Sequence, residues 1–170
     1  MADLLSHVLV AYVLFTVASW QVEWLGPRWV VVGMGGAIVP DLEKVRLVVD
    51  AGLVSQILGV PFTWGHFSTL GGVLLTAGVI TLLFERDHRI RVYGLLVAGG
   101  LSHLVGDGLR VWADGRASQW LFPLVPGWRP PTPNLYVTSD PLVPVVVVAV
   151  AVLVFILDWR RRMGTMGATA

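Results

Sequence analysis

Long apolar blocks joined by short polar connections make up most of the chain. The main apolar runs cover residues 4–20, 29–39, 66–84, 92–111 and 142–159. A membrane-spanning helix needs about 17 to 25 mostly apolar residues, and each of these runs except the second reaches that length. We therefore predict an all-α fold, a polytopic membrane helix bundle of about five segments with one segment short or re-entrant.

Two stretches depart from a simple span. Gly33, Gly35 and Gly36 lie in the short run 29–39 and allow close helix packing, so we expect this run to be buried among the other helices. The stretch 45–62 is apolar but is interrupted by polar and charged residues. This pattern favours an interfacial or re-entrant helix over a span.

The composition strengthens the prediction of an integral membrane protein. Hydrophobic residues make up 55% of the chain and charged residues 14%, and the mean hydropathy is +0.74, which is too apolar for an ordinary soluble domain. The net charge of +1 gives no reason to expect nucleic acid as a partner. We expect residues 1–163 to form a single integral membrane domain and residues 164–170 to form a frayed tail.

Arginine clusters set the expected orientation. The dense basic clusters at 86–91 and 160–162 are separated by a pair of predicted spans, so the positive-inside rule places both clusters in the cytoplasm. By alternation the N-terminus lies outside. The stretch 112–141, rich in proline and aromatic residues, then forms an ordered lid at the outer interface. We expect a multi-pass protein of the cell membrane.

A histidine and an aspartate stand four residues apart in Leu-Ser-His-Leu-Val-Gly-Asp, residues 101–107. At helical spacing His103 and Asp107 share one face, and ionisable groups inside a membrane usually face a bundle interior or a water-filled cavity. Imidazole and carboxylate are good ligands for a divalent ion. Because the chain has no cysteine, any metal must be held by His, Asp, Glu and water. The alternative is a buried hydrogen bond that only joins helices.

The predicted orientation brings further ionisable residues to the same level of the membrane. They occupy the outer ends of membrane segments, with His103 one turn deeper: His7, Asp41, Glu43, His66, Asp107 and Asp140. Ionisable residues with unrelated structural roles would be distributed between the inner and outer ends of the membrane segments. Their shared position at the outer ends therefore favours a metal site on the extracytoplasmic side. The alternative is a non-catalytic protein in which the cluster binds or conducts ions or forms a structural helix-joining network.

Several short motifs follow one another in a specific order. After the helix-borne His7 they are Gly-Ala-Ile-Val-Pro-Asp-Leu-Glu at 36–43, Gly-His-Phe-Ser-Thr at 65–69, Leu-Ser-His-Leu-Val-Gly-Asp at 101–107 and Leu-Phe-Pro at 121–123. In this order and spacing they resemble the membrane-bound metal-dependent hydrolase family of the YdjM type, over about residues 1–125. The chain departs from the family pattern at Glu43, where the family has aspartate, and at Phe62, where it has an earlier histidine.

The resemblance implies a hydrolase that uses a divalent metal, zinc or alternatively manganese. More distantly, the motif order is similar to that of the zinc-dependent phospholipase C and P1 nuclease group, helical enzymes that cleave phosphoesters at clustered metals. The implied metal ligands are His7, Asp41, His66, His103 and Asp107. The expected partners are membrane lipid and a small-molecule or lipid-linked substrate. Glu43 or Asp140 would act as general base or would accept a hydrogen bond that orients a ligating histidine. Arg110 would bind an anionic group such as phosphate.

Overall fold

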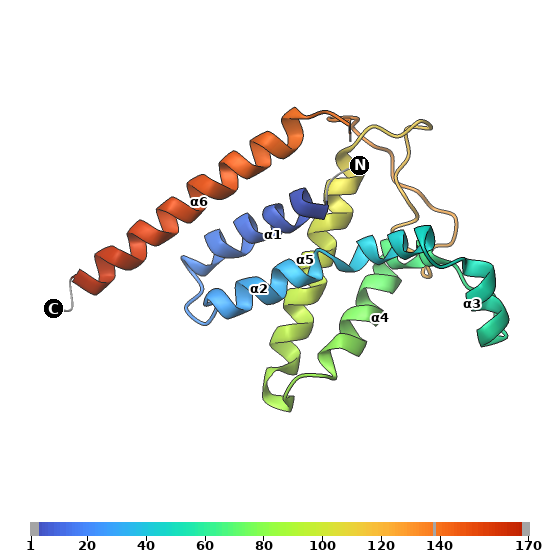
Figure 1. Ribbon diagram of the computed structural model, residues 1–170, viewed down its shortest axis with the longest axis horizontal. Helices are drawn as coiled ribbons and strands as arrows, with labels where there is room; N and C mark the ends of the chain where they lie inside the picture. The colour runs from blue at the N-terminus through green and yellow to red at the C-terminus, as the bar shows by residue number, and fades with distance from the viewer. Residues whose placement is uncertain (1–3, 138, 168–170) are drawn as a thin grey trace.

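The computed structural model describes residues 4–137 and 139–167, and within these ranges the protein is all-α and forms no β-strand (Figure 1). The α-helices are α1 (Leu4–Ser19), α2 (Pro27–Gly36), α3 (Ala51–Leu58), α4 (Leu70–Thr81), α5 (Arg89–Leu109) and α6 (Leu142–Gly167). Short 3-10 helices lie between them: η1 (Val39–Leu47), η2 (Trp64–Ser68) and η3 (Arg86–His88). The predicted all-α fold is confirmed.

Two helices in the described part of the chain are long and apolar enough to cross a membrane, Arg86–Leu109 and Leu142–Gly164. They correspond to α5, preceded by η3, and to most of α6. The helices α1 and α4 are apolar but shorter, with 16 and 12 residues. A bundle of about five membrane segments therefore stays a prediction, since only these two helices have the length that a span requires.

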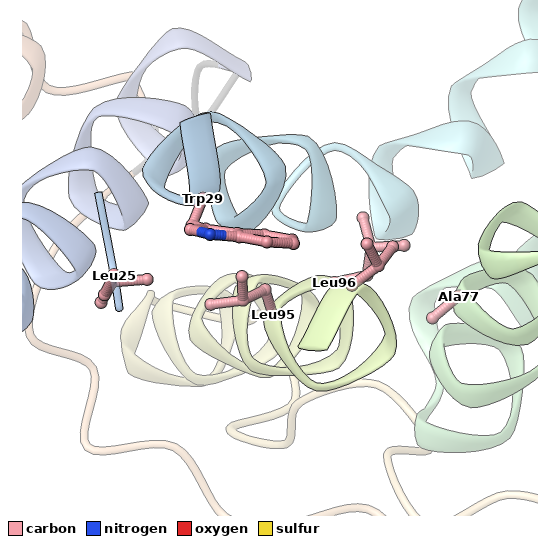
Figure 2. Close-up of a cluster of buried hydrophobic side chains, with 6 residues drawn as sticks. Leu25, Trp29, Ala77, Leu95 and Leu96 are labelled. Atoms are coloured by element: carbon pink, nitrogen blue, oxygen red, sulfur yellow. The ribbon is translucent and has the colours of Figure 1, made fainter. Parts of the chain in front are cut away.

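Helix α2 packs against α5 at close range. The indole of Trp29 lies flat between the two helices above Leu95, and Leu96 points from α5 toward α2 (Figure 2). A glycine makes this approach possible, because a Cβ atom at Gly36 would lie 2.2 Å from the carbonyl oxygen of Leu96. The predicted close packing of the glycine-rich run 29–39 is confirmed for one face of α2, which buries Trp29, Val30, Gly33 and Gly36. The helix ends at Gly36, and Val31 and Ile38 are exposed.

Helix α6 lies along the outside of the bundle and packs mainly on α1 (Figure 1). Ala151 and Val154 are its buried apolar residues, whereas most of its other apolar side chains are exposed. A contiguous exposed apolar surface of this kind is typical of a helix that faces lipid or a protein partner.

Two predicted helix ends differ from the structure. Helix α6 continues to Gly167, past both the predicted end at residue 159 and the predicted start of the frayed tail at 164. An ion pair between Arg162 Nε and Asp158 Oδ2, 2.8 Å apart, spans one helical turn across the predicted end and supports its continuation.

Helix α4 begins at Leu70, four residues later than predicted. The hydroxyl of Thr69 accepts a hydrogen bond from the backbone N–H of Gly72 at 3.1 Å and caps the helix there. Residues 64–68 consequently lie outside α4, in the tighter turn of η2.

The stretch 45–62 contains the end of η1 and the short helix α3, which projects from the rest of the protein (Figure 1). The carboxylate of Asp50 caps α3 by accepting a hydrogen bond from Leu53 N–H at 3.1 Å, and Gly59 ends the helix in a left-handed conformation with φ of 68°. No residue of α3 is buried. Such a short, exposed, apolar helix agrees with the predicted interfacial segment.

The long connection between α5 and α6 is hydrogen-bonded to the start of α4 and to the end of α5. Trp120 accepts from Leu70 N–H at the start of α4, at 2.7 Å, and Tyr136 accepts from Val111 N–H just after α5, at 2.8 Å. Within the connection, the guanidinium of Arg129 pairs with the carboxylate of Asp114. These contacts tie the connection to the bundle, and its predicted role as a lid at the outer interface stays a prediction.

Candidate metal centre

Two helices bring His7, His103 and Asp107 together, with one ligand atom of each lying within 4.8 Å of the others. Helix α1 supplies His7, and α5 supplies His103 and Asp107 from successive turns of one face. His7 Nε2 lies 3.5 Å from Asp107 Oδ1, and His103 Nε2 lies 3.6 Å from Asp107 Oδ2. The predicted convergence is confirmed for these residues, and the group could hold a metal ion.

The backbone at the end of α2 holds His103 in place. The ring is 2% exposed, and its Nδ1 lies 2.7 Å from the carbonyl oxygen of Ala37. A carbonyl oxygen only accepts hydrogen bonds, so we assign the proton to Nδ1 as the donor. In the neutral ring Nε2 then carries a lone pair directed at the carboxylate of Asp107, which is also an acceptor. Two facing acceptors repel each other unless a proton or a metal ion lies between them.

The two histidine–aspartate separations are close to those between ligands of a shared ion. Hydrogen bonds from N–H to O span about 2.7 to 3.2 Å, which is shorter than both histidine–aspartate distances in this group. Two ligand atoms that each lie about 2.1 Å from a tetrahedral ion are about 3.4 Å apart. The observed 3.5 and 3.6 Å, which run to different oxygens of Asp107, are close to that value. The rings of His7 and His103 are stacked nearly parallel, so one ring must turn before both can bind the same ion. Two imidazoles and a carboxylate are also a donor set that leaves a fourth position open.

Asp41 lies at the edge of this group. Its Oδ1 is 3.8 Å from His103 Nε2 and 2.6 Å from Lys44 Nζ. Its Oδ2 is buried and makes no hydrogen bond to any described residue. A buried carboxylate oxygen without a partner is uncommon, and it is the expected state of a ligand atom. Asp41 is therefore a neighbour of the group, and its predicted role as a ligand stays a prediction, because the oxygen nearest His103 is paired with Lys44.

Arg110 stands beside the group, as predicted. Its Nη1 lies 3.3 Å from Asp107 Oδ1, and its guanidinium carbon lies 3.9 Å from the ring centroid of Trp112. The indole N–H of Trp112 donates to the backbone carbonyl of Asp107 at 3.0 Å. The indole thus holds the cation against the end of α5, where it can bind an anion.

The structure does not bring His66 to the centre. Its ring is exposed and stacks on Phe122, with 4.5 Å between centroids and 6° between the planes. The physical reason is the late start of α4, which leaves His66 in the 3-10 turn of η2 instead of on the first helical turn. The ring consequently faces the connection between α5 and α6.

The two predicted general bases occupy different surroundings. Glu43 Oε2 accepts a hydrogen bond from Ser68 Oγ at 2.8 Å, which joins η1 to η2. Asp140 Oδ1 accepts from Leu142 N–H at 2.9 Å at the start of α6. Asp140 also lines a cleft that reaches His7, so of the two carboxylates it is the one placed on an open approach to the centre.

That cleft has a volume of about 650 Å³ and lies between α1, α5 and α6. Tyr136 lines it, and its hydroxyl donates to the carbonyl oxygen of Gly106 at 2.9 Å. Burial raises the pKa of the Tyr136 hydroxyl, and the negative charge of Asp107 adds to this shift. The hydroxyl therefore keeps its proton near neutral pH and remains a donor.

Sequence reasoning missed several residues at the centre. Lys44 lies three residues after Asp41 in η1, and this spacing was a readable signal for their ion pair. Gly106 lies against His7, with an added Cβ only 3.1 Å from the imidazole carbon Cε1. The roles of Ala37 and Tyr136 have no local signal, because both depend on contacts between distant segments.

A scan against protein-family models finds no match to this chain, and searches of curated proteins and of solved structures find none either.

Proposed function

We propose that this protein is a membrane-embedded, metal-dependent hydrolase that cleaves a phosphoester. The observation that carries the proposal is that hydrogen-bond acceptors of different residues face one another in a buried site. His103 donates from Nδ1 to Ala37, and its Nε2 faces the carboxylates of Asp107 and Asp41 at 3.6 and 3.8 Å. Histidine ligands of metals commonly donate their other ring N–H to a backbone carbonyl in this way.

The donor set favours zinc, with manganese as the alternative. Imidazole nitrogen suits zinc, and a site with two histidines and one carboxylate is a common form of catalytic zinc site. Additional carboxylate ligands such as Asp41 shift the preference toward manganese. A bound ion of this kind would supply a nucleophile at neutral pH by lowering the pKa of its water to about 7.

Residues around the centre would bind the phosphate group and transfer protons during hydrolysis. Arg110 would bind the phosphate group, since its guanidinium is fixed between Asp107 and Trp112. Asp140 would accept a proton from the attacking water and return it to the leaving alcohol oxygen. The water oxygen forms a bond to phosphorus, the bond from phosphorus to the alcohol oxygen breaks, and one water is consumed for each ester.

We also place the protein across a membrane as a multi-pass bundle of the YdjM-type hydrolase family. The exposed apolar surface of α6 supports a lipid environment, and the arginine clusters support an extracytoplasmic centre.

The chain has no cysteine, so Leu124→Cys and Ile90→Cys each introduce a single thiol at an exposed position. An impermeant maleimide should label the first variant in intact cells and the second only after lysis. The opposite pattern would reverse the proposed orientation.

Metal content and activity test the hydrolase proposal together. The purified wild type should carry zinc or manganese and hydrolyse phosphoesters in a manner abolished by chelator. Asp107→Asn nearly preserves the shape of the side chain but removes a ligand charge, so it should lower both metal content and activity. Asp87→Asn is the matched control, because Asp87 is exposed at the other end of α5. A metal-free wild type with chelator-insensitive activity would leave a structural helix-joining network as the better interpretation.

A further inference from the structure

The cleft beside the metal centre has the size of a ligand site. Its volume of about 650 Å³ falls within the range of about 300 to 1,000 Å³ that is usual for small-molecule pockets. It exists because α6 packs mainly on α1 and leaves a gap toward α5. His7 belongs both to the wall of the cleft and to the metal-ligand group, so the cleft opens directly onto the proposed reaction centre.

The walls of the cleft change from polar to apolar along its length. His7, Tyr136 and Asp140 line it where α1 and α6 begin. Leu14 and Val147 line it two turns further along the same helices. At a rise of 1.5 Å per residue, the seven residues from His7 to Leu14 correspond to roughly 10 Å of helix. A ligand that fills this cleft must therefore combine a polar end with an apolar portion of about that length.

The surroundings of the cleft point to lipid as the source of such a ligand. One wall is α6, which is long and apolar enough to cross a membrane and exposes most of its apolar side chains. A small soluble phosphoester would leave the apolar walls of the cleft unfilled. A hydrocarbon chain would fill them and would enter from the lipid around α6 without first crossing water.

Building on the proposed function, we propose that the substrate is a phosphoester lipid from the membrane. Its hydrocarbon chain lies between α1, α5 and α6 and ends near Leu14 and Val147, while its phosphate lies at the His7–His103–Asp107 group beside Arg110. Hydrolysis breaks the bond from phosphorus to the lipid alcohol oxygen, adds the water oxygen to phosphorus and leaves a proton on the alcohol. The products are a membrane-soluble alcohol and a water-soluble phosphate.

The absence of native cysteine allows the cleft to be blocked after the protein has folded. Val147→Cys places a thiol in the cleft, and Val146→Cys places one on the neighbouring exposed residue of α6. Both variants are purified in amphipol and then alkylated with a bulky apolar maleimide. Decyl phosphate is the lipid-like substrate, and ethyl phosphate is its short-chain counterpart. Native mass spectrometry of bound decyl phosphate measures occupancy of the cleft without relying on turnover.

Wild type should show a kcat/KM at least about tenfold higher for decyl phosphate than for ethyl phosphate, since chain burial adds binding energy. Alkylation of Val147→Cys should abolish that preference and the binding of decyl phosphate, and alkylation of Val146→Cys should preserve both. Equal hydrolysis of the two substrates, unchanged by alkylation at position 147, would overturn the lipid inference while leaving the hydrolase proposal intact. Binding of decyl phosphate that is blocked only at position 147, without hydrolysis of either ester, would overturn the hydrolase proposal and retain a lipid-binding cleft.

Discussion

The imidazole rings of His7 and His103 stack on each other, with 3.7 Å between their centroids and 14° between their planes. The rings are nearly parallel, and both Nε2 atoms lie near the same carboxylate, 3.5 and 3.6 Å from different oxygens of Asp107. This arrangement spans α1 and α5, so the position of α1 on α5 determines whether a two-histidine site exists. The following predictions separate the ligands from the residues that only support them.

Comparing the replacement of His103 with that of His7 should separate the effect on metal binding from the effect on stability. His103→Leu removes a ligand and also leaves the buried carbonyl of Ala37 without its donor, which costs roughly 1 to 3 kcal/mol. His7→Leu removes a ligand but leaves that hydrogen bond in place. Both variants should lose metal, and in chelator His103→Leu should have the lower thermal unfolding midpoint. Full metal content in His103→Leu would exclude His103 as a ligand.

Replacing His66 should leave the metal centre unchanged. The ring of His66 is exposed and contacts Phe122, so His66→Ala should cost at most about 1 kcal/mol of stacking energy. Metal content, measured by inductively coupled plasma mass spectrometry, should equal that of wild type. A stoichiometric loss of metal would show that η2 rearranges on metal binding and would restore the ligand role predicted by the family resemblance.

A methyl group at Gly106 should weaken metal binding without removing any ligand. An added Cβ would lie 3.1 Å from His7 Cε1, so Gly106→Ala should push the ring from its place and lower metal affinity about tenfold. Gly94→Ala is the control on the same helix, because no atom lies within 4 Å of its added Cβ. Competition with a chromogenic chelator measures both affinities, and equal values would mean that His7 can move freely.

Acid should loosen the connection between α5 and α6. The hydrogen bond and charge of Arg129 hold the pKa of Asp114 below its usual value. Because the folded-state pKa is lowered, the pair stabilises the connection above the ordinary aspartate pKa of about 3.9, and this stabilisation is lost as the pH falls through the folded-state value. Protection of residues 112–137 against hydrogen exchange, taken relative to the intrinsic exchange rate at each pH, should therefore fall in acid for wild type. In Asp114→Asn this protection should already be lowered at neutral pH, and a variant indistinguishable from wild type at neutral pH would contradict this.

Helical periodicity predicted the part of the centre that lies on regular helices. His103 and Asp107 share a face because they lie four residues apart, and the long α5 keeps that relation intact. The same reasoning failed for His66, because a threonine cap moved the helix start and placed the residue in a 3-10 turn. The cleft at Asp140 depends on the irregular segment before α6, whose geometry periodicity does not describe.

The change from α2 to η1 has a consequence for the hydrogen bond that orients His103. In a continuous α-helix the carbonyl oxygen of Ala37 would accept the N–H of Asp41, four residues later. Here the N–H of Asp41 bonds instead to Ile38, at 3.0 Å, and the oxygen of Ala37 is free to receive the imidazole. The winding of the backbone at residues 37–41 therefore leaves the carbonyl oxygen of Ala37 available to His103. A substitution that rewound this segment into α-helix would give that oxygen a second donor, the N–H of Asp41, which would compete with His103 without removing a candidate ligand from the chain.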